Sequence, residues 1–461
     1  MRASERSARI QVADDVWRRL AIGVILSFAA VLAVGAVTRP PFPGAPSAAP
    51  VSEAVAEAPT TPVRSAAATA ASVLPARNAG MPRLVDLHED DAPAGQQGGV
   101  AQAAPVEAAP PTAVPAPATI VSPAPVADPA TAATYQTALE HARIAFGAPG
   151  VSYAVVVGGE LRWTGTSGNP GGVPAADGQP SLVVGSVAKT FMAATVLRLG
   201  EEGRLALDDP VTDYLPEAQL ARGVTIRQLL SHTSGIADLF TSEVEAAIDS
   251  EPSRAWTTAE VLSTIGDAWF EPGAAWAYSN TNYLLLGLLI ERVTGTTLAD
   301  EINRRFSTPL GLTHTAIVGS DGVPGMLNRA LATTFWGSGA MVSTSADLAR
   351  WGDLLYSGDL LWPDTRAAMM RVNDDDYGLG TQRLELEEDF YAYGHSGLLG
   401  WYTTILAHLP EQDVTIAIIA NRGRADLNGM LGHRADGRAS LLDLALGRTP
   451  PAPTPRPSPS P

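Results

Sequence analysis

The 461-residue chain contains no cysteine. This absence excludes disulfide bonds, zinc–thiolate sites and a cysteine nucleophile, and it is compatible with an oxidising or a reducing compartment. There is no His-Glu-x-x-His sequence and the seven histidines do not cluster, so we predict no metal site and no cofactor. There is also no Gly-x-Ser-x-Gly sequence, which argues against an α/β-hydrolase.

Basic residues are scarce, and nearly all of them are arginine. The 31 basic and 48 acidic residues give a net charge of -17, whereas nucleic-acid binding requires a basic surface, so we expect no nucleic-acid partner. The only lysine is Lys189. Lysine can lose its proton in a buried site, and arginine in practice cannot. The single lysine is therefore a candidate for proton transfer.

Proline is unevenly distributed along the chain. Of 37 prolines, 18 lie in residues 38–133 and seven in 449–461, which leaves twelve for residues 134–448. The two proline-rich segments are predicted to be a disordered linker and a disordered tail. The 315 residues of 134–448 are enough to bury a core, and we predict that they fold as one domain.

An apolar run precedes the linker. Residues 20–37 (LAIGVILSFAAVLAVGAV) contain 18 residues without a charge or a proline, about the minimum that spans a bilayer. Five arginines lie before this run, so the positive-inside rule places residues 1–19 in the cytoplasm. We expect a single-pass protein of a bacterial cell membrane with its domain outside. The alternative is a cleaved signal peptide, with Val34 and Ala36 before the cut, and a secreted domain.

The predicted domain begins and ends with β-rich runs. Residues 151–165 read as two strands joined by Gly158-Gly159, and residues 403–421 read as two strands around a turn at 410–413. Helical patterns include 135–146, 284–295 and 345–358. This order predicts an α/β fold of the α+β sandwich type. An antiparallel sheet is closed by the two hairpins and flanked by helices, and a helical insert forms a second lobe.

The first motif whose residues are suited to catalysis contains the lysine. Ser186-Val187-Ala188-Lys189 opens an amphipathic run that ends at Gly203. A helix start offers free backbone N–H groups to an anion developing at Ser186, and Lys189 lies one turn away on the same face. If the amine is buried, its pKa falls below about 10.4 and it can accept the serine proton. A surface serine and lysine on a helix is the alternative interpretation.

The second motif is Tyr278-Ser279-Asn280, in a polar turn before the apolar helix at 284. A tyrosine can shuttle a proton if a nearby ammonium lowers its pKa. Asn280 can contact Lys189 and a substrate amide at once. Taken alone, the motif is also typical of a helix N-cap beside an exposed aromatic residue.

The third motif is His395-Ser396-Gly397, just before the first C-terminal strand. A glycine allows the backbone to approach a ligand closely. A strand edge presents N–H groups to an oxyanion or to an extended peptide. Taken alone, this motif is a turn.

Together the three motifs, SVAK, YSN and HSG in this order, resemble those of the penicillin-recognising serine hydrolases. The resemblance is closest to the branch of class C β-lactamases, D-alanyl-D-alanine carboxypeptidases, D-aminopeptidases and related esterases. It extends over roughly residues 135 to 445 and includes four further blocks: GAPGVSYAVVVGGEL, IRQLLSHTSGI, EPGAAWAYSNTNYLLLG and GSGAMVSTSADLARW.

The resemblance implies a role for each motif residue. Ser186 is the nucleophile that forms an acyl-enzyme, and Lys189 and Tyr278 transfer protons to the leaving group and from water. Asn280 positions Lys189 and the substrate. The backbone N–H groups of Ser186 and Leu398 form the oxyanion hole.

The third motif is implied to bind substrate through His395, Ser396 and Gly397. His395 stands where many members have lysine, which weakens the grip on a substrate carboxylate and makes that grip depend on pH. This departure favours a peptidase or an esterase over a dedicated β-lactamase. The stretch after Tyr278 is also shorter than in class C enzymes.

The resemblance therefore predicts a D-alanyl-D-alanine carboxypeptidase or similar D-peptidase acting on cell-wall peptides outside the cytoplasm. Its expected substrates are D-amino-acid peptides, esters or β-lactams. A carboxylesterase or β-lactamase of the same family is one alternative, and an inactive wall-binding scaffold on the same fold is another. His232 is predicted to be a structural loop residue, 320–322 an ordinary loop, and 374–376 an acidic turn that does not bind calcium.

Overall fold

The computed structural model describes residues 126–174 and 178–449. The predicted segments 1–19 and 20–37, most of the linker 38–133 and nearly all of the tail 449–461 lie outside these residues. In the described ranges, no helix is long and apolar enough to cross a membrane.

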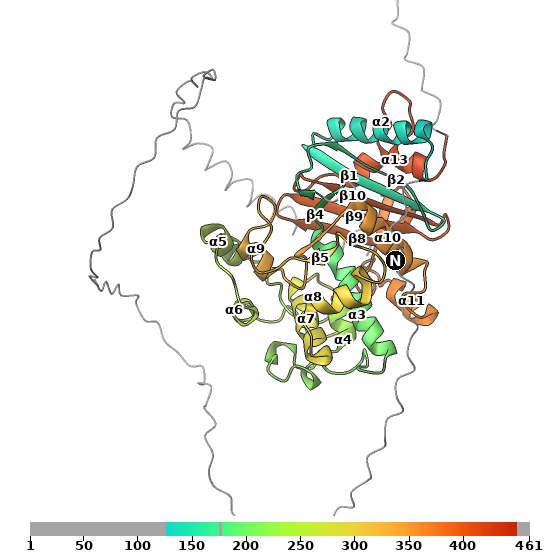
Figure 1. The fold of residues 1–461 in the computed structure, drawn as a ribbon. Helices are drawn as coiled ribbons and strands as arrows, with labels where there is room; N and C mark the ends of the chain where they lie inside the picture. The colour runs from blue at the N-terminus through green and yellow to red at the C-terminus, as the bar shows by residue number, and fades with distance from the viewer. Residues whose placement is uncertain (1–125, 175–177, 450–461) are drawn as a thin grey trace, which may run out of the picture. The chain divides into compact units, whose positions relative to one another are not determined.

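A six-stranded antiparallel sheet forms the centre of the domain, in the order β2-β1-β10-β9-β8-β7 (Figure 1). Its strands are Gly150–Val157 (β1), Glu160–Gly168 (β2), Gln382–Glu387 (β7), Phe390–Leu399 (β8), Tyr402–Leu409 (β9) and Val414–Ala420 (β10). β1 pairs with β10, so the first and last strands of the domain meet inside the sheet. The predicted sheet closed by N- and C-terminal hairpins is confirmed.

The glycine pair between β1 and β2 forms the predicted tight turn. Val157 pairs with Glu160, which leaves Gly158 and Gly159 as a two-residue loop. Both have positive φ, 58° and 78°. Two-residue hairpin loops of this type need positive φ at both positions, which glycine adopts without strain.

The two faces of the sheet are buried in different cores. Alternate side chains of β1 separate cleanly: Tyr153 and Val155 belong to one cluster, and Ala154 and Val156 to the other. The first cluster lies under α2 (Pro129–Ala145) and α13 (Leu441–Ala445), as Figure 1 shows, and it includes buried residues of α12 (Leu427–Gly432). The second is the larger core shared with the helical lobe. Strands covered on both faces are apolar at nearly every position, as β1 and β10 are.

The first helix begins earlier than the sequence pattern predicts. α2 starts at Pro129, not at 135, and so extends into the segment predicted to be linker. Asp128 caps it by accepting the backbone N–H groups of Ala130 and Thr131. The alanine and threonine residues after Pro129 resemble the linker in composition, whereas Asp128 and Pro129 form a local helix start that this pattern did not use.

The helical lobe and a smaller sheet lie on the other face. The helices are Ala188–Glu201 (α3), Ile226–Leu230 (α4), Ser242–Ser250 (α5), Thr258–Ser263 (α6), Asn280–Thr294 (α7), Leu298–Ile302 (α8), Arg329–Thr334 (α9), Ser345–Tyr356 (α10) and Pro363–Met370 (α11). Short turns are Gly185–Val187 (η1), Val211–Asp213 (η2), Gln219–Ala221 (η3) and the π-helical Asn303–Ser307 (η4). The small sheet has the order β3-β4-β6-β5, with strands Val173–Pro174, Pro180–Val183, Met341–Ser343 and Ala316–Ile317.

The predicted end of α7 and the predicted start of α10 are confirmed in this lobe. α7 ends at Thr294 and is followed by Gly295 in the left-handed conformation, with φ 72°. α10 begins at Ser345 as predicted, and Thr344 caps it. It stops at Tyr356, two residues before the glycine that the pattern marked.

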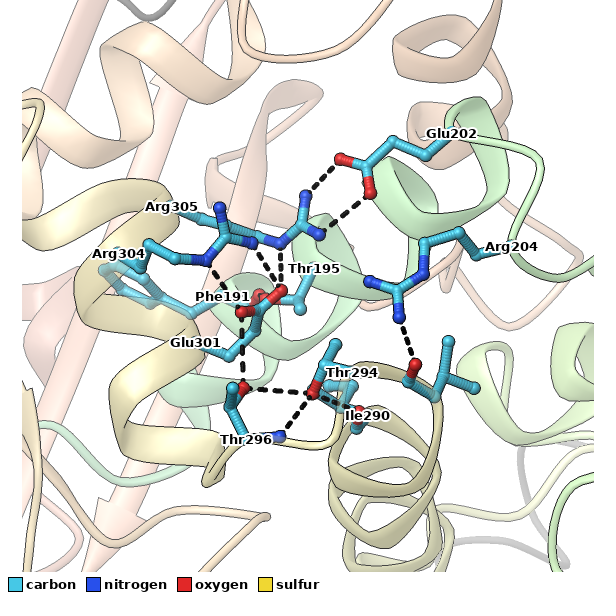
Figure 2. A network of polar contacts seen from close by, with 11 residues as sticks. Phe191, Thr195, Glu202, Arg204, Ile290, Thr294, Thr296, Glu301, Arg304 and Arg305 are labelled. Carbon is cyan, nitrogen blue, oxygen red and sulfur yellow. Dashed lines mark hydrogen bonds and ion pairs between the residues drawn. The ribbon is translucent and has the colours of Figure 1, made fainter. Parts of the chain in front are cut away.

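A buried ion network holds the far end of α3 (Figure 2). Arg305 of η4 contacts Glu202 after α3 and Glu301 of α8, and Arg304 binds Glu301 at 2.9 Å. Glu301 is 1% exposed and Arg305 7%. Charges this deeply buried are tolerated only when paired, so the network fixes how α3 packs against α8 and η4. It thereby anchors the helix that carries Lys189.

Candidate active site

Ser186 and Lys189 lie at the junction between η1 and α3. Gly185 has a φ of 55°, which makes the sharp turn from β4 into η1. α3 then runs into the core with eleven of its residues buried, so Lys189 is 0% exposed. Its Nζ lies 3.0 Å from Ser186 Oγ. The spacing in the sequence predicted this contact, and the alternative of a surface pair is wrong.

The Lys189 amine has three polar neighbours. Besides Ser186 Oγ, it donates to Asn280 Oδ1 at 2.9 Å and to the carbonyl oxygen of Ser338 at 2.6 Å. Burial lowers the pKa of Lys189 to about 7, although the charge of Asp238 opposes this fall. Near neutral pH a large fraction of the amine is therefore unprotonated, with a lone pair available.

Tyr278 lies against the same amine. The centre of its ring is 5.0 Å from Lys189 Nζ, and a hydrogen bond with Ser186 favours its charged form. Burial nevertheless raises the pKa of Tyr278 well above its ordinary value. The sequence suggested a proton shuttle if a nearby ammonium lowers this pKa. That condition is not met, because burial outweighs the neighbouring groups. Tyr278 remains protonated and can only donate its proton or relay one.

Asn280 is the first residue of α7. Its side-chain oxygen faces Lys189, and its side-chain nitrogen faces Asp238 Oδ2 at 3.2 Å. Its backbone N–H donates to Asp238 Oδ1 at 2.8 Å. The structure therefore brings Asn280 to the lysine, as the sequence predicted, and adds a carboxylate behind it.

Strand β8 supplies the opposite wall. A Cβ on Gly397 would lie 2.1 Å from the carbonyl oxygen of Val184 and 3.2 Å from the backbone nitrogen of Ser186. Only glycine allows the strand to lie this close to η1. A Cβ on Gly185 would likewise lie 2.7 Å from Leu398 N.

The backbone amide of Leu398 faces the same space. β7 pairs with β8 only as far as Gly394, so the edge of β8 is open beyond that residue. The N–H of Ser396 points to this open side, where it donates to Gln382 Oε1 at 2.8 Å. N–H directions alternate along a strand, so the N–H of Leu398 points the same way, toward Ser186. The two predicted oxyanion-hole amides are thus close together.

His395 does not lie as expected. It is 1% exposed; its Nε2 lies 3.0 Å from Tyr377 Oη, and its Nδ1 lies 2.5 Å from the carbonyl oxygen of Ser396. A carbonyl can only accept, so Nδ1 carries the proton and Nε2 accepts from the tyrosine. Burial, and then the charge of Lys189, lower the pKa of His395 to about 3. The imidazole is therefore neutral at physiological pH, and the expected pH-dependent grip on a carboxylate is wrong.

Sequence reasoning missed three residues of the site: Ser338, Asp238 and Tyr377. A signal existed for two of them, since Ser338 and Asp238 lie in or beside blocks quoted for the family resemblance. Tyr377 follows the acidic turn 374–376, where nothing in the local sequence points to His395. His232 is buried with a φ of 58°, and its Nδ1 accepts the backbone N–H of Ser279 at 3.2 Å. This agrees with the structural role predicted for it.

The remaining candidates lie away from this cluster. Asp321, in the 320–322 loop, is 92% exposed and lies 3.8 Å from Arg329. Asp376 pairs with Arg383 at 2.5 Å. Within residues 126–174 and 178–449, no group of three or more histidine and acidic side chains could hold a metal ion.

Comparison with protein families agrees with this geometry. A family model described as Beta-lactamase matches residues 136–438. The chain belongs to this family. Its fold is the family's fold, and the protein is a serine hydrolase, as the sequence motifs predicted.

Two penicillin-binding proteins are moderately similar to this chain in sequence. Penicillin-binding protein 4 of Amycolatopsis lactamdurans is 29% identical over 334 residues, covering 63% of this chain and 85% of that protein. Penicillin-binding protein 4* of Bacillus subtilis (strain 168) is 28% identical over 273 residues, covering 51% of this chain and 60% of that protein. The chain thus spans less than two thirds of the Bacillus relative.

Solved structures show the same fold. A D-stereospecific amidohydrolase from Streptomyces sp. is 30% identical with a TM-score of 0.57, covering 67% of this chain and 99% of that one. A penicillin-binding protein homologue from Pyrococcus abyssi is 24% identical with a TM-score of 0.54, covering 69% of this chain and 78% of that one. The second likeness concerns the fold alone.

Proposed function

We propose that this serine hydrolase is a D-peptidase that acts through an acyl-enzyme on Ser186. The observation that carries the proposal is the 3.0 Å contact between Ser186 Oγ and a fully buried lysine amine whose pKa is lowered to about 7. A neutral amine has two hydrogens and one lone pair. Asn280 Oδ1 and the Ser338 carbonyl accept the hydrogens, which leaves the lone pair for the serine proton.

The reaction follows from these positions. Ser186 Oγ attacks the substrate carbonyl as its proton passes to Lys189 Nζ, and the negative oxygen that forms is held by the N–H groups of Ser186 and Leu398. The proton then passes to the leaving nitrogen or oxygen through the protonated Tyr278, the scissile bond breaks, and an ester to Ser186 remains. Water attacks this ester as Lys189 takes its proton, the proton then passes to Ser186 Oγ as the ester bond breaks, and the acid product leaves the regenerated serine.

The open edge of β8 supports a peptide-like substrate. Beyond Gly394 no strand of the described residues pairs with this edge of β8. The N–H of Ser396 binds the Gln382 side chain there, and an extended substrate chain can add along the edge in its place. The Amycolatopsis relative is named for penicillin binding, and the Streptomyces relative is named a D-stereospecific amidohydrolase. Both names support D-amino-acid peptides of the cell wall as the substrate class. D-alanyl-D-alanine carboxypeptidase activity is the specific form that we propose.

A specific observation favours a second candidate. Because His395 is neutral and bound to Tyr377, it offers no fixed positive charge to a substrate carboxylate. An amide or ester without a free carboxylate suits such a site better than a peptide acid does. A D-aminopeptidase or carboxylesterase of the same family is therefore the alternative. Rates on a D-Ala-D-Ala peptide, on its C-terminal amide and on a short-chain ester separate the candidates.

The acyl-enzyme itself is tested by intact mass. After incubation with benzylpenicillin, we expect the protein to gain the mass of one drug molecule, and we expect Ser186→Ala to gain none. Slow release of the adduct would indicate a penicillin-binding peptidase. An adduct that persists in Ser186→Ala would contradict the nucleophile. If the wild type neither gains mass nor hydrolyses any of the three substrates, the inactive scaffold becomes the better account.

We further propose that the enzyme works outside the cytoplasm, held by residues 20–37 in the membrane. Support comes from the length of this apolar run and from the arginines before it. We expect the full-length protein to sediment with membranes and to keep its original N-terminal peptide in mass spectrometry. A mature N-terminus just after Ala36 in the soluble fraction would instead show a secreted enzyme.

A further inference from the structure

Asp238 lies directly behind the asparagine of the site. It belongs to the loop between α4 and α5, and its two carboxylate oxygens bind the same residue, Asn280. Oδ1 accepts the backbone N–H at 2.8 Å and Oδ2 accepts the side-chain nitrogen at 3.2 Å. Burial raises the pKa of Asp238, whereas the hydrogen bonds from Asn280, the charge of Lys189 and the backbone N–H of Phe240 oppose this rise and favour the carboxylate.

These contacts decide which way the Asn280 amide points. An asparagine side chain has a donor end and an acceptor end, and either end can face a given neighbour. A carboxylate can only accept, so Asp238 requires the –NH₂ end on its side. The oxygen then faces Lys189, which it meets at 2.9 Å. The amide has a second N–H, which this orientation leaves for a substrate carbonyl.

We propose that Asp238 is a positioning residue of the hydrolase, which orients Asn280 and sets the proton affinity of Lys189 through its negative charge. The inference rests on the proposed function, since Lys189 is taken as the base. Asp238 itself touches neither Ser186 nor the substrate in this scheme. It acts through the amide of Asn280 and through its electric field.

The other groups around Lys189 carry no charge that could replace it. Tyr278 and Tyr283 face the amine, with ring centres 5.0 and 5.3 Å from Nζ, and burial raises the pKa of both phenols. His232 and His395 also interact electrostatically with Lys189, and burial lowers the pKa of both. The phenols and imidazoles are thus neutral, and Asp238 is the charge that opposes the burial of Lys189.

The presence of a single lysine allows the proton affinity of Lys189 to be measured directly. Lys189 is the only lysine, so lysine labelled with carbon-13 at Cε gives one signal from the whole chain. We expect its NMR titration in the full-length protein to have its midpoint near pH 7. In Asp238→Asn the midpoint should fall by about one pH unit, because a nearby opposite charge favours the ammonium and has been removed.

The rate of ester hydrolysis provides a second measurement. Asparagine at 238 can still accept from the backbone N–H of Asn280, but its own –NH₂ then opposes the –NH₂ of Asn280. We expect the pH–rate profile of ester hydrolysis to move to lower pH with the titration, and the rate on its plateau to fall by about tenfold to a hundredfold. Asp321→Asn, in an exposed loop, is the matched control and should change neither.

The outcomes separate two failures. An unchanged Lys189 midpoint in Asp238→Asn overturns the positioning role, even if activity falls because the loop is disturbed. A shifted midpoint in a protein that forms no Ser186 adduct keeps the electrostatic inference and rejects the proposed function. A lost fold is recognised from the amide spectrum, and Asp238→Glu, which keeps the charge, should then retain the wild-type midpoint to within about half a pH unit.

Discussion

Lys189→Arg is expected to abolish acylation, with a rate at least about a thousandfold below that of the wild type. Arginine keeps the positive charge and nearly the length of lysine, but it does not lose its proton in proteins. It therefore has no lone pair for the serine proton at the place where Lys189 Nζ lies 3.0 Å from Ser186 Oγ. Stopped-flow measurement of the acylation burst with a chromogenic ester gives the rate directly.

The pH dependence gives this prediction a second part. Below about pH 7 Lys189 is mostly protonated and cannot accept a proton, so the wild-type rate should rise as pH increases through that value and then level off. Lys189→Arg should show no such rise. Arg198→Lys, the reverse exchange on the same helix at an ion pair with Glu201, is the control and should keep most of its activity. Comparable rates for Lys189→Arg and wild type would exclude Lys189 as the base.

Gly397→Ala is expected to lower the turnover rate by about a hundredfold to a thousandfold, as the loss of one oxyanion-hole donor does. The added methyl group would lie 2.1 Å from the carbonyl oxygen of Val184, so β8 and η1 must move apart. The amides of Leu398 and Ser186 are then too far apart to hold one oxygen together. Overpacking of this kind also costs about 1 to 3 kcal/mol of stability, which urea denaturation measures.

Gly266→Ala is the matched control for this substitution. A Cβ there meets nothing within 4 Å, and the residue does not have a positive φ. Its activity and its free energy of unfolding should stay close to those of the wild type. If Gly397→Ala instead forms the acyl-enzyme at the wild-type rate, β8 does not provide the second amide, and the oxyanion hole has to be sought elsewhere.

The structures of the local motifs could be predicted from the sequence because each depends on short-range geometry. A serine and a lysine three residues apart share one face of any helix, so their contact follows from the sequence once a helix is assigned. The hairpin at Gly158-Gly159 and the end of α7 at Gly295 depend on positive φ at glycines, which is also a local property. The start of α2 was misplaced because its first residues resemble the linker in composition, although Asp128 and Pro129 provide a local N-cap and a proline in the first turn.

The protonation states of the site residues could not be predicted from the sequence in this way. The YSN motif suggested a proton shuttle on the condition that a nearby ammonium lowers the tyrosine pKa, and the family resemblance implied a His395 whose charge depends on pH. Neither applies, because burial raises the pKa of Tyr278, and burial together with the charge of Lys189 lowers the pKa of His395. The partner of His395, Tyr377, lies 18 residues away in a segment with no motif.

The family, the serine hydrolase class, the antiparallel sheet and the contact of Ser186, Lys189 and Asn280 could all be predicted from the sequence. These predictions rest on local spacing and on the choice of lysine at one position in a chain that otherwise uses arginine. The tertiary structure was needed to show that Lys189 is buried beside Ser186, that His395 is neutral and that Asp238 binds Asn280. These properties depend on desolvation and on contacts between α3, α7, β8 and the loop of Asp238, which are distant in sequence and become neighbours only when the two lobes pack together.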